Sequence, residues 1–271
     1  MVQTSHAPNP GHTGSWYAAS ANDRTARPTL EDDLTADICV IGAGFTGLSA
    51  AIELAERGYS VVVLEAVRVG FGASGRNGGQ IVNGYSRDLA TIAGRYGKEK
   101  AAHLGAMSLE GGNIIRGRIE KYGIDCDLRH GGFFAAFTTK QIREMEENRA
   151  NWQKHGHNGL EMVSKQEVGR YVKSDRYAGG MIDRFGGHIH PLNYCLGEAK
   201  AIEAMGGRIF ENSPVVSIEK SAKPRVRTAK GSVTANYLLV CGNAYLGGVL
   251  PEVSERMMPV SIQVMATEPL D

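Results

Sequence analysis

The chain has 271 residues, with 30 lysines and arginines against 29 acidic residues and a net charge of +1. This balance offers no basic surface for nucleic acid or an anionic membrane, so a small molecule is the expected partner. No stretch is apolar enough to predict a secretory signal or a membrane span, and the expected location is the cytoplasm.

The first 35 residues are polar and predict an N-terminal tail, although SWYAAS (15–20) carries two aromatic side chains that a solvated tail does not need. From Ala36 the pattern changes. ADICVIG is a short apolar run, FTGLSAAIELAERG has helical spacing, and YSVVVLEA is a second apolar run. This order predicts a βαβ unit with parallel strands buried on both faces.

A second pattern occupies 86–189, where helices are predicted over 98–122 and 139–154 and a strand at GGFFAAFTT. A further helix is predicted from Pro191 to Gly206 or Gly207, and a hairpin around Lys230 and Gly231 leads into a strand that stops at Gly242. The predicted fold class is α/β: a Rossmann-like domain with a parallel sheet (36–85 and 190–253) and an α+β substrate lobe (86–189 and 254–271).

The first predicted strand ends in GAGFTG, in which Gly42, Gly44 and Gly47 match G-x-G-x-x-G. Such a turn presents a helix N-terminus to a pyrophosphate, and Glu65 at the end of the next strand is placed to accept hydrogen bonds from a ribose. An acid there disfavours NADP relative to NAD or FAD. A merely structural turn is the alternative.

The choice between FAD and NAD depends on the glycine-rich stretch GFGASGRNGGQ. A chain that lays bare backbone along a large flat ligand has reason to use glycine repeatedly, which favours an extended flavin over a nicotinamide-dependent dehydrogenase. Asn77 and Gln80 can meet the pyrophosphate or the flavin ring, and Arg76 can meet a phosphate or a substrate carboxylate. The alternative is a flexible surface loop.

VIGAGFTGLSAAIELAERGYSVVVLEA followed by GASGRNGGQ resembles the D-amino-acid oxidase-like superfamily of FAD-dependent amine and amino-acid oxidoreductases. Resemblance to its gamma-glutamylputrescine oxidase branch is carried by four segments: SWYAASAN, GFGASGRNGGQIVNGYSRD, GGHIHPLNY and VRTAKGSVTANYLLVCGNAYLG. The resemblance implies FAD as cofactor and oxidation of an amine by dioxygen, giving aldehyde, ammonia and hydrogen peroxide. It also implies the following cofactor contacts: Gly42, Ala43, Gly44, Phe45, Thr46, Gly47, Glu65, Ala66, Ala73, Ser74, Gly75, Arg76, Asn77, Gly78, Gly79, Gln80, Val215, Cys241 and Gly242.

Catalytic candidates are few. His188 and His190 have side-chain pKa values in the range useful for substrate deprotonation. The alternative to a catalytic role is a structural one, in which both histidines lie on one face of a short strand and only hydrogen-bond the backbone. Arg76 and Tyr85 are further candidates. Four dispersed cysteines, Cys39, Cys126, Cys195 and Cys241, predict reduced and mostly buried thiols, and no metal site is expected.

In the resembling family the chain continues past the position of Asp271 and returns with a last glycine-rich turn near the flavin. The resemblance therefore implies an N-terminal portion of such an enzyme, whose last residues, 257–271, are expected to form a strand of the substrate lobe. Two function classes stay open: an FAD-dependent amine oxidase, and a non-catalytic remnant that binds a dinucleotide or another protein.

Overall fold

The computed structural model describes residues 11–260, 262, 265 and 267. The chain divides into two compact units. The first unit holds the described parts of Met1–Gly78 and His190–Asp271 together with Tyr122–Cys126, and the second holds Gly79–Lys121 and Asp127–Ile189.

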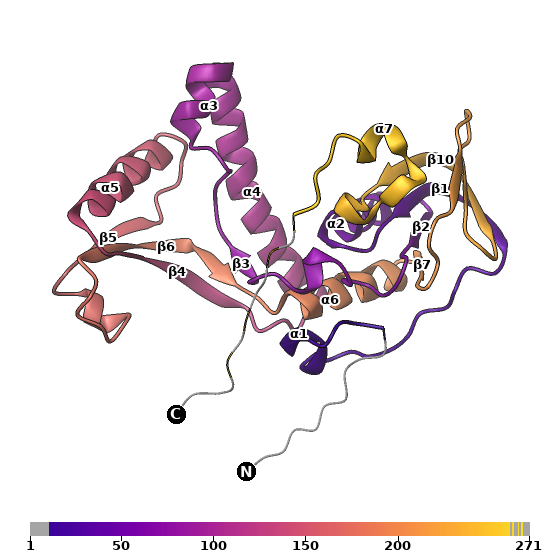
Figure 1. Ribbon diagram of the computed structural model, residues 1–271, viewed down its shortest axis with the longest axis horizontal. Helices are drawn as coiled ribbons and strands as arrows, with labels where there is room; N and C mark the ends of the chain where they lie inside the picture. The colour runs from indigo at the N-terminus through magenta and orange to yellow at the C-terminus, as the bar shows by residue number, and fades with distance from the viewer. Residues whose placement is uncertain (1–10, 261, 263–264, 266, 268–271) are drawn as a thin grey trace, which may run out of the picture. The chain divides into compact units, whose positions relative to one another are not determined.

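The first unit is built on a six-stranded sheet with the strand order β7-β2-β1-β10-β9-β8. Four strands run parallel: β1 (Asp33–Ile41), β2 (Val61–Leu64), β7 (Arg208–Phe210) and β10 (Ser232–Val240). β9 (Arg225–Arg227) pairs antiparallel with β10, and β8 (Ser217–Glu219) pairs antiparallel with β9. The strands β9 and β10 form the predicted hairpin, with Lys230 and Gly231 in the connection. The predicted α/β class with a parallel sheet is confirmed (Figure 1).

Both faces of the parallel strands are buried, as the continuous apolar runs predict. Ile38 and Val40 of β1 pack in one core with α2 (Phe45–Glu56) and α6 (Pro191–Ala204). The alternate residues Cys39 and Ile41 pack in a second core with residues of β9 and β10. Alternate side chains of the extended strand thus pack into two different cores. Only the ends of the strands therefore stay accessible for a ligand-binding site.

The described residues before β1, 11–32, are more ordered than the predicted tail. Its residues 16–19 form α1 (Trp16–Ala19), whose first turn is capped because the Ser15 hydroxyl accepts a hydrogen bond from the Ala18 amide at 3.2 Å. Ala18 and Leu30 are buried, with Leu30 packed against the second core of the sheet. The polar composition did not predict this order, because only a few apolar residues and backbone hydrogen bonds hold the segment in place.

The second unit is an antiparallel sheet with helices. Its elements are β3 (Gln80–Ile81), α3 (Leu89–Tyr96), nearly all of α4 (Lys98–Tyr122), β4 (Arg129–Ala136), α5 (Thr139–Gln153), β5 (Leu160–Ser164) and β6 (Gly179–His188). β6 pairs with β4, β3 and β5. The helices predicted over 98–122 and 139–154 and the strand at GGFFAAFTT are confirmed.

The last element described is α7 (Pro251–Ser254), which contacts the turn Gly247–Val249. The described residues that follow it group with the first unit, whereas the sequence pattern assigns 254–271 to the second lobe. The strand expected over 257–271 falls largely outside the described residues.

Two general expectations about the chain can be compared with the structure. Cys39, Cys126 and Cys195 are buried free thiols and Cys241 is half-buried. Within the part of the chain that the structure describes, no helix has the length and apolar character needed to span a bilayer.

Candidate nucleotide-binding site

The turn between β1 and α2 has the geometry that its glycines predict. Gly42 has φ +101°, a conformation that side chains disfavour. A Cβ on Gly47 would lie 1.9 Å from the Gly42 carbonyl oxygen, so α2 packs on the turn at a distance only glycine permits. The N-cap residue Gly44 makes no side-chain cap hydrogen bond. The first turn of α2 therefore presents backbone N–H groups and the positive end of its dipole.

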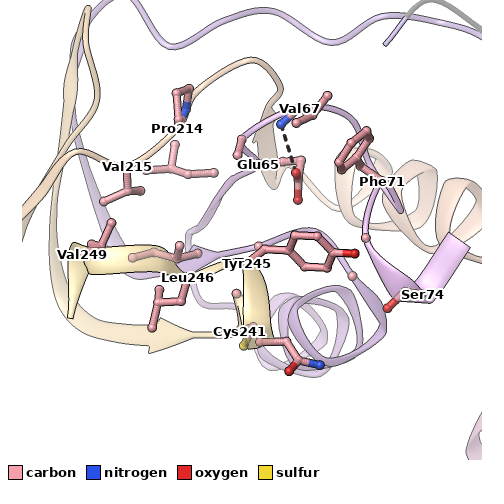
Figure 2. Close-up of a pocket in the computed structure, with 18 of the residues that line it drawn as sticks. Glu65, Val67, Phe71, Ser74, Pro214, Val215, Cys241, Tyr245, Leu246 and Val249 are labelled. Carbon is pink, nitrogen blue, oxygen red and sulfur yellow. Dashed lines mark hydrogen bonds between the residues drawn. The ribbon is translucent and has the colours of Figure 1, made fainter. Parts of the chain in front are cut away.

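Glu65 follows β2 at the same edge of the sheet. Its Oε2 accepts a hydrogen bond from the Ala43 amide at 2.8 Å. Its Oε1 accepts one from the Val67 amide at 3.0 Å, which Figure 2 shows as a dashed line. Burial raises the pKa of this carboxyl, with the nearby Glu211 charge adding to the rise and the backbone donors opposing it. Each carboxylate oxygen keeps further acceptor capacity, so the pair can receive two vicinal hydroxyl groups of a ribose.

A cavity of about 290 Å³ opens beside these two features. This volume is near the lower end of the roughly 300–1,000 Å³ of small-molecule sites. Four segments wall it: the end of β1 with its turn, the end of β2 with its loop, the loop before β8, and the segment after β10. Its lining residues are Ile41, Gly42, Gly44, Leu64, Glu65, Ala66, Val67, Phe71, Gly72, Ala73, Ser74, Ser213, Pro214, Val215, Cys241, Gly242, Asn243, Tyr245, Leu246 and Val249.

The two ends of the cavity differ in chemistry. Val215, Leu246 and Val249 gather at one end, and Phe71 and Ser74 lie at the other, with Tyr245 between them (Figure 2). An apolar end accepts a flat purine ring, whereas the other end has the helix N-terminus and its donors. This contrast is what a site for an adenosine diphosphate moiety requires, because its purine is flat and weakly polar and its phosphates are charged.

The glycine-rich stretch after β2 folds back onto the phosphate turn. The Ser74 hydroxyl accepts a hydrogen bond from the Phe45 amide at 2.9 Å, and a Cβ on Gly44 would lie 2.8 Å from that hydroxyl oxygen. Asn77 donates its side-chain amide to the carbonyls of Ala73 at 3.1 Å and Ser74 at 2.9 Å. Asn77 therefore braces the loop from within and is not among the residues that line this cavity. Its contact with the cofactor stays a prediction.

Arg76 lies beside the polar end of the cavity. Its Nη2 donates a hydrogen bond to the Tyr245 hydroxyl at 3.0 Å, and its guanidinium carbon lies 5.1 Å from the centroid of the Phe71 ring. Both aromatic residues line the cavity. A guanidinium held in this way suits a phosphate better than a mobile side chain does, because less rotamer entropy is lost on binding.

The remaining residues of the predicted stretch divide between the units. Gly75 lies in the short helix η1 (Ala73–Gly75), and Gly78 ends the first segment of the first unit. Gly79 and Gln80 belong to the second unit, where Gln80 pairs with His188 in the β3–β6 ladder.

The two histidines predicted to share one strand face lie on different elements. His188 ends β6 and is exposed, while His190 is the buried N-cap of α6. Pro191 at the start of α6 explains the change, because proline favours the first helical turn and leaves the preceding residue as the cap. The Nδ1 of His190 accepts from the Asn193 amide at 3.1 Å and its Nε2 lies 3.1 Å from the Ser20 hydroxyl. Both ring nitrogens thus serve the fold.

Sequence reasoning missed several lining residues. They include Phe71, Ser213, Pro214, Tyr245, Leu246 and Val249. Their signal is positional, since they follow the ends of β2, β7 and β10, and ligands of open α/β sheets bind outside the carboxyl ends of the strands. Of the predicted residues outside the turn itself, Glu65, Ala66, Ala73, Ser74, Val215, Cys241 and Gly242 all line the cavity. Ala43, Phe45 and Thr46 lie in the turn and the first turn of α2, next to the lining residues Gly42 and Gly44.

This fold and site define a dinucleotide-binding protein, and comparison with known proteins gives its family. The family model described as FAD dependent oxidoreductase matches residues 37–271, and the chain belongs to this family. FAD is accordingly its cofactor.

Among curated relatives, the chain is 54% identical over 260 residues to gamma-glutamylputrescine oxidoreductase of Escherichia coli (strain K12), covering 96% of this chain and 61% of that protein. It is 43% identical to a probable oxidoreductase OrdL of Haemophilus influenzae, covering 96% of this chain and 62% of the relative. The chain thus spans about 60% of the length of the curated relatives it matches.

Solved structures show the same fold. Glycine oxidase from Geobacillus kaustophilus superposes with a TM-score of 0.66 at 20% identity, covering 80% of this chain and 59% of that one. L-proline dehydrogenase from P. horikoshii superposes with a TM-score of 0.69 at 19% identity, covering 84% and 58%. The predicted family membership is confirmed.

Proposed function

We propose that this chain carries the FAD-binding part of an oxidoreductase that oxidises the C–N bond of an amine of the gamma-glutamylputrescine type. The observation that carries the proposal is the glycine turn with Glu65 beside a cavity of graded polarity, in a chain 54% identical to a gamma-glutamylputrescine oxidoreductase. The cofactor is needed because no amino-acid side chain accepts a hydride from carbon.

The chain's own residues have three roles in this proposal. The α2 N-terminus and the Ser74 loop hold the pyrophosphate, with Arg76 balancing part of its charge. Glu65 accepts hydrogen bonds from the ribose of the adenosine half. Val215, Leu246 and Val249 enclose the adenine and exclude water from it.

The overall reaction balances with water and dioxygen. A primary amine R–CH2–NH2 loses two electrons and two protons as its C–N bond becomes an imine, and water then releases R–CHO and ammonia. Bound FAD would supply the acceptor for the hydride from the carbon next to nitrogen, and dioxygen would take up the two electrons to give hydrogen peroxide. Assistance of substrate deprotonation by His188 or His190 stays a prediction. The exposed His188 is the better candidate in this proposal, because both ring nitrogens of His190 already contact Asn193 and Ser20.

The test is an absorbance spectrum of the purified chain with FAD, followed by anaerobic addition of gamma-glutamylputrescine, with putrescine as the control that lacks the glutamyl carboxylate. We expect protein-bound flavin bands that bleach with the first amine and not with the second, and peroxide once air is readmitted. Bound flavin that neither amine bleaches would refute the catalytic proposal for this chain and leave a non-catalytic dinucleotide-binding protein. A chain that retains no flavin would refute the binding proposal as well.

A further inference from the structure

The segment that precedes β1 is tied to the nucleotide cavity through a buried carboxylate. Glu211 directly follows β7 and is fully buried, although a carboxylate rarely is unless it is paired. Its Oε2 accepts a hydrogen bond from the Arg27 amide at 3.0 Å, and its Oε1 accepts one from the Val69 amide at 2.9 Å. One side chain therefore joins three segments that are far apart in sequence.

Two buried arginines complete the network. Arg68 places Nε 3.0 Å from Oε2 of Glu211 as an ion pair, and it donates from Nη2 to the Thr25 carbonyl at 3.1 Å. Arg27 holds Glu203 of α6 with two hydrogen bonds, Nε to Oε1 at 2.7 Å and Nη2 to Oε2 at 3.0 Å. The two arginines and two glutamates balance in charge, with Glu203 at the exposed edge of a network that is otherwise buried.

Backbone hydrogen bonds extend the network to the cavity wall. The Asn212 amide donates to the Val67 carbonyl at 3.0 Å, and the Ser213 amide donates to the Glu65 carbonyl at 2.9 Å. The Ser213 hydroxyl accepts from the Leu30 amide at 2.9 Å. The loops 65–69 and 211–215, which supply six of the lining residues, are thus fixed to each other and to the segment 24–30.

We propose that Arg27, Arg68 and Glu211 are positioning residues for the adenosine half of the cofactor, and that segment 24–30 is the clamp that keeps loops 65–69 and 211–215 in their binding arrangement. None of the three side chains lines the cavity. Loops that wall a ligand site otherwise lose conformational freedom on binding, and a buried network of ion pairs and hydrogen bonds that already holds them lowers that cost before the ligand arrives. This inference rests on the proposed function, since it assumes that the cavity takes the adenosine half of FAD.

The test compares Glu211→Gln with the unchanged chain in calorimetric titrations with FAD and with ADP, together with amide hydrogen exchange. Glutamine keeps the size of the side chain but cannot balance two buried arginines or accept at both terminal atoms. We expect the dissociation constants of both ligands to rise by about tenfold, and exchange to accelerate in loops 65–69 and 211–215. The matched control is Glu53→Gln, which breaks an exposed ion pair with Arg57 and is expected to leave both ligand affinities unchanged.

A milder variant keeps the proposal testable if Glu211→Gln fails to fold. Arg27→Lys retains the charge but loses the planar fork that holds Glu203, and we expect both dissociation constants to rise by about threefold. A folded variant that melts at a lower temperature yet binds ADP and FAD like the unchanged chain would overturn the inference, because the network would then serve stability alone. An unchanged chain that binds neither ligand would refute the proposed function and this inference together, whereas normal binding in every variant would refute only the inference.

Discussion

Replacing Gly47 with alanine tests the geometry of the phosphate turn. The added Cβ would lie 1.9 Å from the Gly42 carbonyl oxygen and 3.2 Å from Cγ1 of Val40, while real Cβ contacts do not fall below 3.0 Å. The close atom belongs to the backbone, so no rotamer change relieves the clash, and α2 or the turn must move by about 1 Å. Overpacking of this kind costs about 1–3 kcal/mol.

The displaced helix end also bears on binding, since the N–H groups of α2 must meet the pyrophosphate at hydrogen-bond distance. We expect Gly47→Ala to lower the free energy of unfolding by about 2 kcal/mol and to raise the dissociation constant for FAD by at least about tenfold. Urea titration measures the first quantity, and quenching of flavin fluorescence measures the second.

The matched control is Gly94→Ala, since Gly94 lies within α3, where an added Cβ would meet no atom within 4 Å and φ is not positive. The same chemical change there is expected to stabilise the chain by about 0.5–1 kcal/mol, because alanine loses less conformational entropy in a helix. If the Gly47→Ala variant has the same free energy of unfolding and the same dissociation constant for FAD as the unchanged chain, the argument for close packing at the turn is refuted.

Three further changes have expected outcomes. Glu65→Gln should raise the dissociation constant for FAD about tenfold in titration calorimetry, because the NH2 group of glutamine accepts no hydrogen bond from a backbone N–H or a ribose hydroxyl. Equal affinity would refute the ribose contact. Tyr245→Phe should weaken FAD by about threefold through loss of the hydroxyl that holds Arg76, and normal affinity would show that this hydrogen bond is dispensable. The third change concerns Asp183. Burial alone would raise the pKa of its carboxyl, but the hydrogen bond and charge of His157 lower this pKa below the ordinary value of 3.8. The ionised carboxylate therefore stabilises the fold fully above its unfolded-state pKa, and this contribution is lost as pH falls through the lower folded-state pKa. Asp183→Asn should remove this acid-side dependence of the urea midpoint on pH.

Sequence patterns predicted those parts of the site that depend on local geometry. The positive φ of Gly42 and the tight packing of Gly47 follow from a motif whose spacing has a single physical purpose. Glu65 was predictable because it ends a strand that lies next to the glycine turn in any βαβ unit. The long helix α4 was readable because its helical pattern continues without a break.

The unpredicted parts depend on contacts between distant segments. Arg27 and Glu211 are 184 residues apart, and nothing in either local sequence marks the partner. Alternation over three residues is too weak to fix His190 in a strand, and the capping preference imposed by Pro191 prevails. Tyr245 lies in a short turn after β10, where no periodic pattern exists to indicate a role.

The strand order of the first unit has a consequence for synthesis of the chain. β1 pairs with β10 along its length, from Asp33 with Ser232 to Ile41 with Val240, so the central pair of the sheet joins residues almost 200 positions apart. At translation rates of about 5–20 residues per second, β1 would wait about 10–40 s for this partner. During that interval one edge of an apolar strand stays open, which is the kind of surface that chaperones recognise and aggregation exploits. The nascent chain is thus expected to need protection until residue 240 has left the ribosome.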